Sequence, residues 1–163
     1  MTPSAQSGAE YDRARELVLE YGWNSTAYQI LNPGFELWFS AVRPAVVGYV
    51  RAGGRRVVGG APVAADADLR DVAEEFERDS RAAHAGVVYF GAEERLEALY
   101  RGTKTHTAIL LGAQPSWDPA DWAGIIATHS SLRAQLNRAR NKGVTVALWP
   151  SDRAERSPEL KTL

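Results

Sequence analysis

The residues best suited to chemistry are four cations in one predicted helix. Residues 130–142 read Ser-Ser-Leu-Arg-Ala-Gln-Leu-Asn-Arg-Ala-Arg-Asn-Lys, and Gly143 follows. A serine cap, leucines four residues apart and a closing glycine predict a helix. The cations that could contact a phosphate backbone or another polyanion are Arg133, Arg138, Arg140 and Lys142. We expect this basic helix to bind an anionic partner, and the alternative is a solvated helix face.

Charge along the chain supports that expectation. Residues 130–163 hold 7 Lys or Arg and 3 Asp or Glu, whereas residues 1–129 hold 12 and 17. The formal net charge of the whole chain is only −1. Because an anion responds to local potential more than to net charge, the basic helix is the expected polyanion-binding surface.

A glycine loop is a second candidate anion site. Gly59, Gly60 and Pro62 precede a predicted helix, where free backbone N–H groups and the helix dipole favour an anion. The loop matches neither the Gly-x-Gly-x-x-Gly pattern nor the Walker pattern. A tight turn that joins a strand to a helix is therefore the favoured interpretation.

The histidines offer one weak catalytic candidate. His84, His106 and His129 are too far apart for a sequence-local metal motif, so we assign no metal and no cofactor. His106, near Lys104 on a predicted strand, could be a general base near neutral pH. A partly exposed strand histidine without catalytic function is the favoured alternative.

Two tryptophans lie close together beyond the last histidine-bearing strand. Trp117 and Trp122 flank a predicted helix start and could stack on a base or line an acyl pocket. We favour core or lid packing for both, because Ile125 and Ile126 offer a nearby apolar surface.

The elements that must position these residues follow from hydrophobic periodicity. The predicted helices cover residues 9–20, 69–83, 93–101 and 130–142. The predicted strands cover residues 25–31, 36–42, 45–50, 55–58, 86–90, 103–111 and 144–148. The first four strands read as a meander. We therefore predict an α/β protein with a mixed, mostly antiparallel sheet flanked by helices.

Composition is that of one globular domain. The chain has 163 residues, 45% of them hydrophobic, and no cysteine, which excludes disulfides and thiolate chemistry. We expect a disordered N-terminal tail at 1–9, a single domain at 10–149 and a C-terminal tail at 150–163. No signal segment or membrane-spanning run is visible, so we expect a cytoplasmic protein that meets a membrane only peripherally, at its inner face.

Several short motifs occur together in a characteristic order. They are Tyr21-Gly22, Asn24-Ser25, Trp38-Phe39, Gly60-x-Pro62 ahead of a helix containing Phe76, and Leu132-Arg133 to Lys142-Gly143. Over residues 10–149 this order resembles the amino-terminal GNAT-like half of the phosphatidylglycerol lysyltransferase carboxyl-terminal domain family. The chain differs from the Gly-Asp-Pro pattern of that family, because Ala61 stands where the aspartate would fall.

The resemblance implies an aminoacyl-tRNA-dependent aminoacyltransferase built from two GNAT-like halves. Aminoacyl-tRNA would be a co-substrate, and the acceptor a lipid or another small molecule; in the best-known branch it is an anionic lipid at the membrane surface. This chain has about half the size of such a protein. The resemblance therefore implies transferase activity only when a second GNAT half, or a homodimer, completes the site.

Two other functions stay open. The first is a non-catalytic GNAT-like scaffold or dimerisation module, because no nucleophile or metal motif is present. The second is an acyl-CoA N-acetyltransferase. It is the weaker alternative, because the Arg/Gln-x-x-Gly-x-Gly/Ala signature of acetyl-CoA-binding GNAT enzymes is missing.

Overall fold

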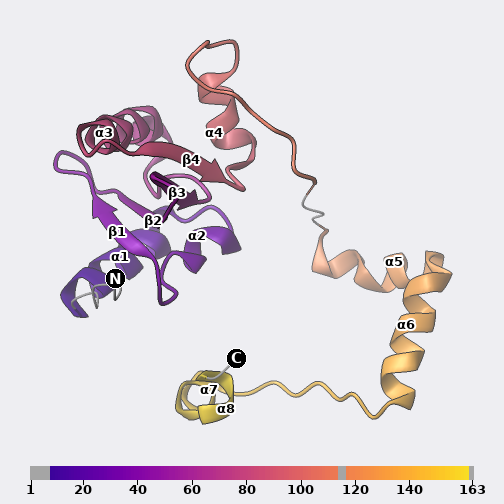
Figure 1. Cartoon of the computed structure of the whole chain (residues 1–163). Helices are drawn as coiled ribbons and strands as arrows, with labels where there is room; N and C mark the ends of the chain where they lie inside the picture. Colours follow the sequence, from indigo (N-terminus) through magenta and orange to yellow (C-terminus); the bar gives the residue numbers. More distant parts are fainter. Residues whose placement is uncertain (1–7, 114–116, 162–163) are drawn as a thin grey trace. The chain divides into compact units, whose positions relative to one another are not determined.

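The computed structural model in Figure 1 describes residues 8–113 and 117–161. The chain divides into two compact units, Met1–Leu111 and Gly112–Leu163. Their boundary falls inside the range 10–149 that the sequence predicts as one domain. Residues 1–7 of the expected N-terminal tail lie outside the described residues.

The first unit contains a four-stranded sheet with the order β1-β2-β3-β4. Strands β1 (Glu36–Phe39), β2 (Val46–Ala52) and β3 (Arg55–Gly59) pair antiparallel, and β4 (Gly86–Phe90) pairs parallel to β3. A parallel neighbour needs a crossover, and a helix supplies it between β3 and β4. The predicted mixed, mostly antiparallel sheet with flanking helices is confirmed.

Helices cover both faces of this sheet (Figure 1). They are α1 (Gly8–Tyr21), α2 (Ser25–Gln29), α3 (Leu69–Ala82) and α4 (Glu93–Tyr100), with a 3₁₀ turn η1 (Asp66–Asp68) before α3. Adjacent residues of a strand point to opposite faces, so Val46 joins the cluster beneath α1 and α2 while Val47 joins the cluster beneath α3. At the centre of the second cluster, Phe76 is fully buried.

One predicted strand is wrong, because residues 25–31 form helix α2 and its end. The Asn24 side chain accepts a hydrogen bond from the Ala27 N–H at 2.9 Å and so caps the helix. Beyond the helix, Ile30 and Leu31 are buried against the sheet. The alternation of apolar residues here reflects one short helical turn and its exit, and not a strand.

Two other predicted strands, 103–111 and 144–148, are also wrong. Both segments lack a ladder, and in the sheet β4 pairs only with β3. Leu110 is 91% exposed, and Leu148 is 99% exposed. Alternation shows that a segment suits a sheet, but a strand forms only where a partner edge supplies hydrogen bonds and apolar contacts.

In the described residues of the second unit, the regular secondary structure is helical. It contains η2 (Pro119–Asp121), α5 (Trp122–Thr128), α6 (Ser130–Asn141), α7 (Ser151–Arg156) and α8 (Pro158–Lys161). The last two helices occupy the range predicted as a C-terminal tail. Within the described ranges, no helix is both long enough and apolar enough to cross a bilayer.

Replacing Gly48 with alanine should destabilise the first unit. A methyl group at Gly48 would lie 2.3 Å from Cβ of the fully buried Ile30, so strand or helix must shift. Overpacking of this kind costs about 1–3 kcal/mol. Urea unfolding followed by tryptophan fluorescence should show a lower midpoint. Gly112→Ala, with no atom within 4 Å of the added methyl, is the control; equal midpoints for Gly48→Ala and wild type would contradict the prediction.

Candidate functional site

The basic helix predicted from the sequence is α6. Its C-terminal end is confirmed, because Gly143 has a φ of +74° and donates from its N–H to Arg140 O at 2.9 Å. The expected serine cap is wrong. His129 is the N-cap residue, and its side chain makes no capping hydrogen bond.

The four cations of α6 differ in their contacts. The Arg133 Nη1 group donates to the carbonyl oxygens of Ile126, at 3.0 Å, and Ala127, at the end of α5. That guanidinium therefore stabilises the junction of the two helices, in addition to any anion contact. The three other cations are exposed and make no ion pair within the described residues: Arg138, Arg140 and Lys142.

The glycine loop is buried in the first unit. Gly59 ends β3, and the Gly60 N–H donates to Phe90 O at 2.8 Å. Gly60 and Pro62 are both buried. A loop that receives an anion must present free N–H groups, and that of Gly60 is already paired. The positive φ of Gly60, +83°, fits the tight turn that the sequence favours.

His106 belongs to a cluster around a buried carboxylate. Glu77, on α3, is only 9% exposed in its side chain. Its Oε1 atom lies 3.0 Å from His106 Nε2 and accepts hydrogen bonds from the hydroxyls of Tyr100, at 2.8 Å, and Tyr89, at 3.1 Å. The carboxylate thus has the several partners that a buried charge requires.

The His106 ring is fixed on a second side as well. It stacks on the ring of Tyr100 with 3.6 Å between centroids, and its side chain keeps 28% exposure. Its other nitrogen, Nδ1, lies 2.9 Å from the hydroxyl of Thr105, which is exposed. The arrangement of carboxylate, imidazole and hydroxyl is one that can move a proton.

Sequence reasoning named His106 but missed the other members of its cluster, which are Glu77, Tyr89 and Tyr100. A signal for one of them was present. Glu77 lies in the apolar stripe of α3, four residues after Ala73 and three before the buried Ser80. A carboxylate at such a position must find partners in the core, although the sequence does not show that Tyr89 and Tyr100 supply them.

The burial that surrounds Glu77 also perturbs two tyrosines. Burial raises the pKa of Tyr89 above its ordinary value, and the nearby Glu77 carboxylate and Tyr100 raise it further. Burial also raises the pKa of Tyr100, together with its hydrogen bond to Glu77. Both hydroxyls therefore remain protonated at neutral pH, and each can donate a hydrogen bond to the Glu77 carboxylate.

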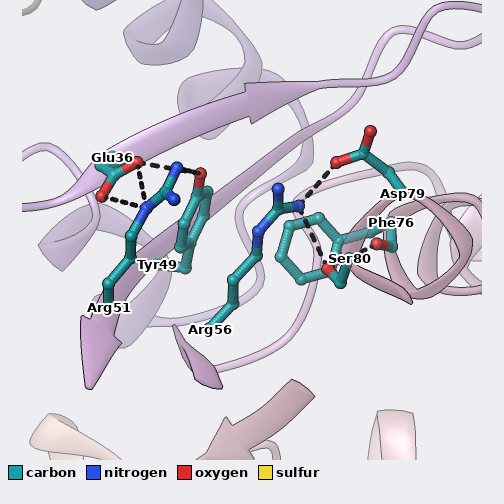
Figure 2. Close-up of polar contacts among 7 residues, drawn as sticks. All are labelled: Glu36, Tyr49, Arg51, Arg56, Phe76, Asp79 and Ser80. Atoms are coloured by element: carbon teal, nitrogen blue, oxygen red, sulfur yellow. Dashed lines mark hydrogen bonds and ion pairs between the residues drawn. The ribbon is translucent and has the colours of Figure 1, made fainter. Parts of the chain in front are cut away.

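A second polar network lies between the sheet and α3 (Figure 2). Arg51 and Arg56 stand directly opposite each other on β2 and β3, where like charges repel. Glu36 neutralises the first, accepting from Arg51 Nε at 2.9 Å. Asp79 neutralises the second, with its Oδ2 atom 2.6 Å from Arg56 Nη1.

The two arginines also contact aromatic rings in this network. The Arg56 guanidinium, 8% exposed in its side chain, lies 5.1 Å from the Tyr49 ring centroid and 5.4 Å from that of Phe76. The hydrogen bond from Arg51 lowers the pKa of Glu36, with a further contribution from Tyr49, against the opposing effect of burial. Because every charge here has an internal partner, we interpret the network as part of the scaffold.

Trp117 and Trp122 pack on each other in the second unit. Their ring centroids are 5.7 Å apart in a stacked arrangement, and the two residues are 55% and 37% exposed. Within the described residues, no group of three or more histidine, aspartate or glutamate side chains is placed to hold a metal ion.

The fold and the cluster describe a mixed α/β domain with one partly exposed histidine and a separate basic helix. Residues 15–163 match the family described as phosphatidylglycerol lysyltransferase, C-terminal, and the chain belongs to that family. The match extends beyond the predicted limit of 149 and includes α7 and α8. No curated protein and no solved structure matches the chain.

The raised tyrosine pKa values predict a loss of stability in alkali. A group whose pKa is higher in the folded chain stabilises the fold fully below its unfolded pKa of about 10, and this contribution is lost as pH rises above that value. Wild type should therefore lose stability above about pH 10. The Tyr89→Phe variant should lose less stability over the same pH step, measured as the change in urea midpoint. Tyr28→Phe, at an exposed position, is the control; an identical pH dependence in Tyr89→Phe and wild type would refute the assignment.

Proposed function

We propose that this chain acts in an aminoacyl-tRNA-dependent aminoacyltransferase, which moves an aminoacyl group from tRNA to a lipid or another small acceptor. The observation that carries the proposal is the family match over residues 15–163. The basic helix α6 supports it, because a tRNA acceptor stem is a dense array of phosphates.

In this proposal α6 supplies the contact with tRNA. Arg138 and Lys142 lie four residues apart and so form one line on the helix, while Arg140 lies elsewhere on its surface. Leu132 and Leu136 are partly buried, whereas these three cations are exposed to solvent. Such a surface favours phosphates without reading sequence, which suits a protein that takes an activated ester from the end of an RNA.

The reaction itself requires little covalent chemistry from the protein. An aminoacyl ester is already activated, so holding it against a hydroxyl or amine supplies much of the rate. The family description names phosphatidylglycerol, an anionic lipid with free hydroxyls. We therefore propose an acceptor of this class, met peripherally at the inner face of the membrane.

A second candidate is a non-catalytic GNAT-like scaffold or dimerisation module. The observation that favours it is the exposure of apolar extended segments. Val146 is 97% exposed and Leu148 is 99% exposed, and Ile109 in the first unit is 77% exposed. Exposed apolar segments often mark interaction surfaces. A chain that self-associates and binds no tRNA would favour this candidate.

Removing the three unpaired cations of α6 should abolish tRNA binding. The triple variant Arg138→Ala, Arg140→Ala, Lys142→Ala keeps Arg133 and its contacts at the α5–α6 junction, so the helix should persist. Wild-type affinity should fall with salt at a log–log slope of about 2–3 if most of these charges contact phosphates. Fluorescence anisotropy with labelled tRNA measures both quantities.

The control for that experiment removes a charge elsewhere. Arg101 pairs with Glu97 and Glu94 on α4, so Arg101→Ala changes the net charge without touching α6. It should bind tRNA like wild type. Unchanged affinity in the triple variant, or binding that ignores salt, would show that α6 is only a solvated face.

Transfer can be measured directly with labelled lysyl-tRNA and vesicles containing phosphatidylglycerol. Label should move into the lipid, and vesicles of phosphatidylcholine alone should receive none. Because the resemblance implies two GNAT-like halves, the rate per chain should rise with chain concentration as dimers form. If no label leaves the tRNA for lipid at any concentration, while tRNA still binds, the transferase proposal is wrong and the scaffold candidate gains support.

A further inference from the structure

We propose that His106 is the general base of the transfer and that Glu77 positions it, a proposal that rests on the function proposed above. The substrate class would be an acceptor with a hydroxyl group. The site lies where α3, β4 and the segment after α4 meet, and it uses no residue of α6.

The hydrogen bonds of Glu77 fix the tautomer of His106. The hydroxyls of Tyr89 and Tyr100 both donate hydrogen bonds to Glu77 Oε1, so this oxygen serves as an acceptor. The His106 Nε2 atom, 3.0 Å from the same oxygen, must then carry the proton. Its Nδ1 atom is left with a lone pair. In a triad the carboxylate holds the histidine in the same way.

The basic nitrogen faces the side of the cluster that substrate can reach. Thr105, whose hydroxyl lies 2.9 Å from Nδ1, is exposed, whereas Glu77 is buried behind the imidazole. The Thr105 oxygen thus marks a position within hydrogen-bond reach of Nδ1, while the Thr105 hydroxyl itself donates to Thr103 Oγ1 at 3.2 Å. An acceptor hydroxyl that took this position would be within hydrogen-bond reach of the base.

The stack on Tyr100 restricts the imidazole further. With 3.6 Å between ring centroids and one nitrogen held by Glu77, a flip of the ring would break the Glu77 contact and a tilt would break the stack. Orientation of this kind is what a positioned base needs. The charged groups around the cluster are Glu77 and Glu74 on α3 and Arg70, also on α3, whose field reaches Tyr100.

The proposed step balances without a co-reactant. The acceptor O–H proton moves to His106 Nδ1 as the acceptor oxygen attacks the carbonyl carbon of the aminoacyl ester. The tetrahedral intermediate then breaks its bond to the ribose oxygen of the tRNA, and that oxygen takes the proton from Nδ1. The Glu77 carboxylate stabilises the imidazolium that exists between these events. The imidazole ends in its starting form.

Substitution of His106 separates chemistry from binding. His106→Ala should lower kcat for transfer from lysyl-tRNA to phosphatidylglycerol by roughly 10²–10⁴-fold. Its affinity for tRNA should stay within twofold of wild type, because α6 is intact. Added imidazole should restore part of the lost rate, which it would not do if His106 were merely structural. A wild-type kcat in His106→Ala, or a loss that imidazole does not restore in a folded variant, would overturn the proposal.

Two further variants complete the experiment. Glu77→Gln keeps a similar side-chain shape but loses the charge, so kcat should fall while KM changes little. Lys104→Ala, an exposed residue near His106, is the matched control and should behave like wild type. Circular dichroism and urea midpoints show which variants fold. A folded Glu77→Gln chain with wild-type kcat would refute the positioning role of Glu77.

Failure of this proposal can be told apart from failure of the proposed function. If wild type transfers nothing from lysyl-tRNA, the same variants are compared on p-nitrophenyl acetate, an activated ester that needs no tRNA contact. Faster release of p-nitrophenol by wild type than by His106→Ala, with rescue by imidazole, would support the base although the substrate class was wrong. Equal rates would overturn the base itself.

Discussion

The register of α3 on the sheet is the constraint on which the rest of the first unit depends. Phe76 fixes it, because its ring is fully buried and meets Trp38 edge-on, with 5.3 Å between centroids. An α-helix has 3.6 residues per turn, so once the Phe76 side chain points inward, the directions of the neighbouring side chains are fixed as well. Glu77 and Ser80 must then also face the core, where each needs a polar partner.

That register explains why two charged networks lie beside the same helix. Asp79 and Ser80, near the end of α3, reach Arg56 of the sheet, whereas Glu77 reaches β4 and the segment after α4. In the first network each arginine has a carboxylate, so the charges largely cancel. In the second, one carboxylate is shared by three hydroxyl or imidazole groups. Of the two networks, only the second contains an imidazole.

Sequence predicts those parts of the structure that depend on periodicity and local caps. The apolar spacing of 69–83 located α3 to within one residue, and Gly143 marked the end of α6. Strand predictions failed where the formation of a strand depends on a partner strand. Segment 103–111 has strand-like alternation but no ladder, so His106 is held by side chains instead of by a strand. The Glu77 cluster joins residues 29 positions apart, and no local pattern encodes such a contact.

The two candidate sites belong to different compact units of the chain, so in the proposed function they would serve different stages of the transfer. In the proposed function, the cations of α6 would attract a polyanion over a long range and so set how tightly and how fast it binds. In the proposed step, the imidazole of His106 would accept one proton over a single hydrogen bond and so set the rate after binding. When two sites share no interaction partners, the free-energy changes caused by substitutions at each site add. Removing both sites in one chain should therefore multiply the loss in affinity by the loss in rate, whereas a departure from that product would mean that the two units act on each other during transfer.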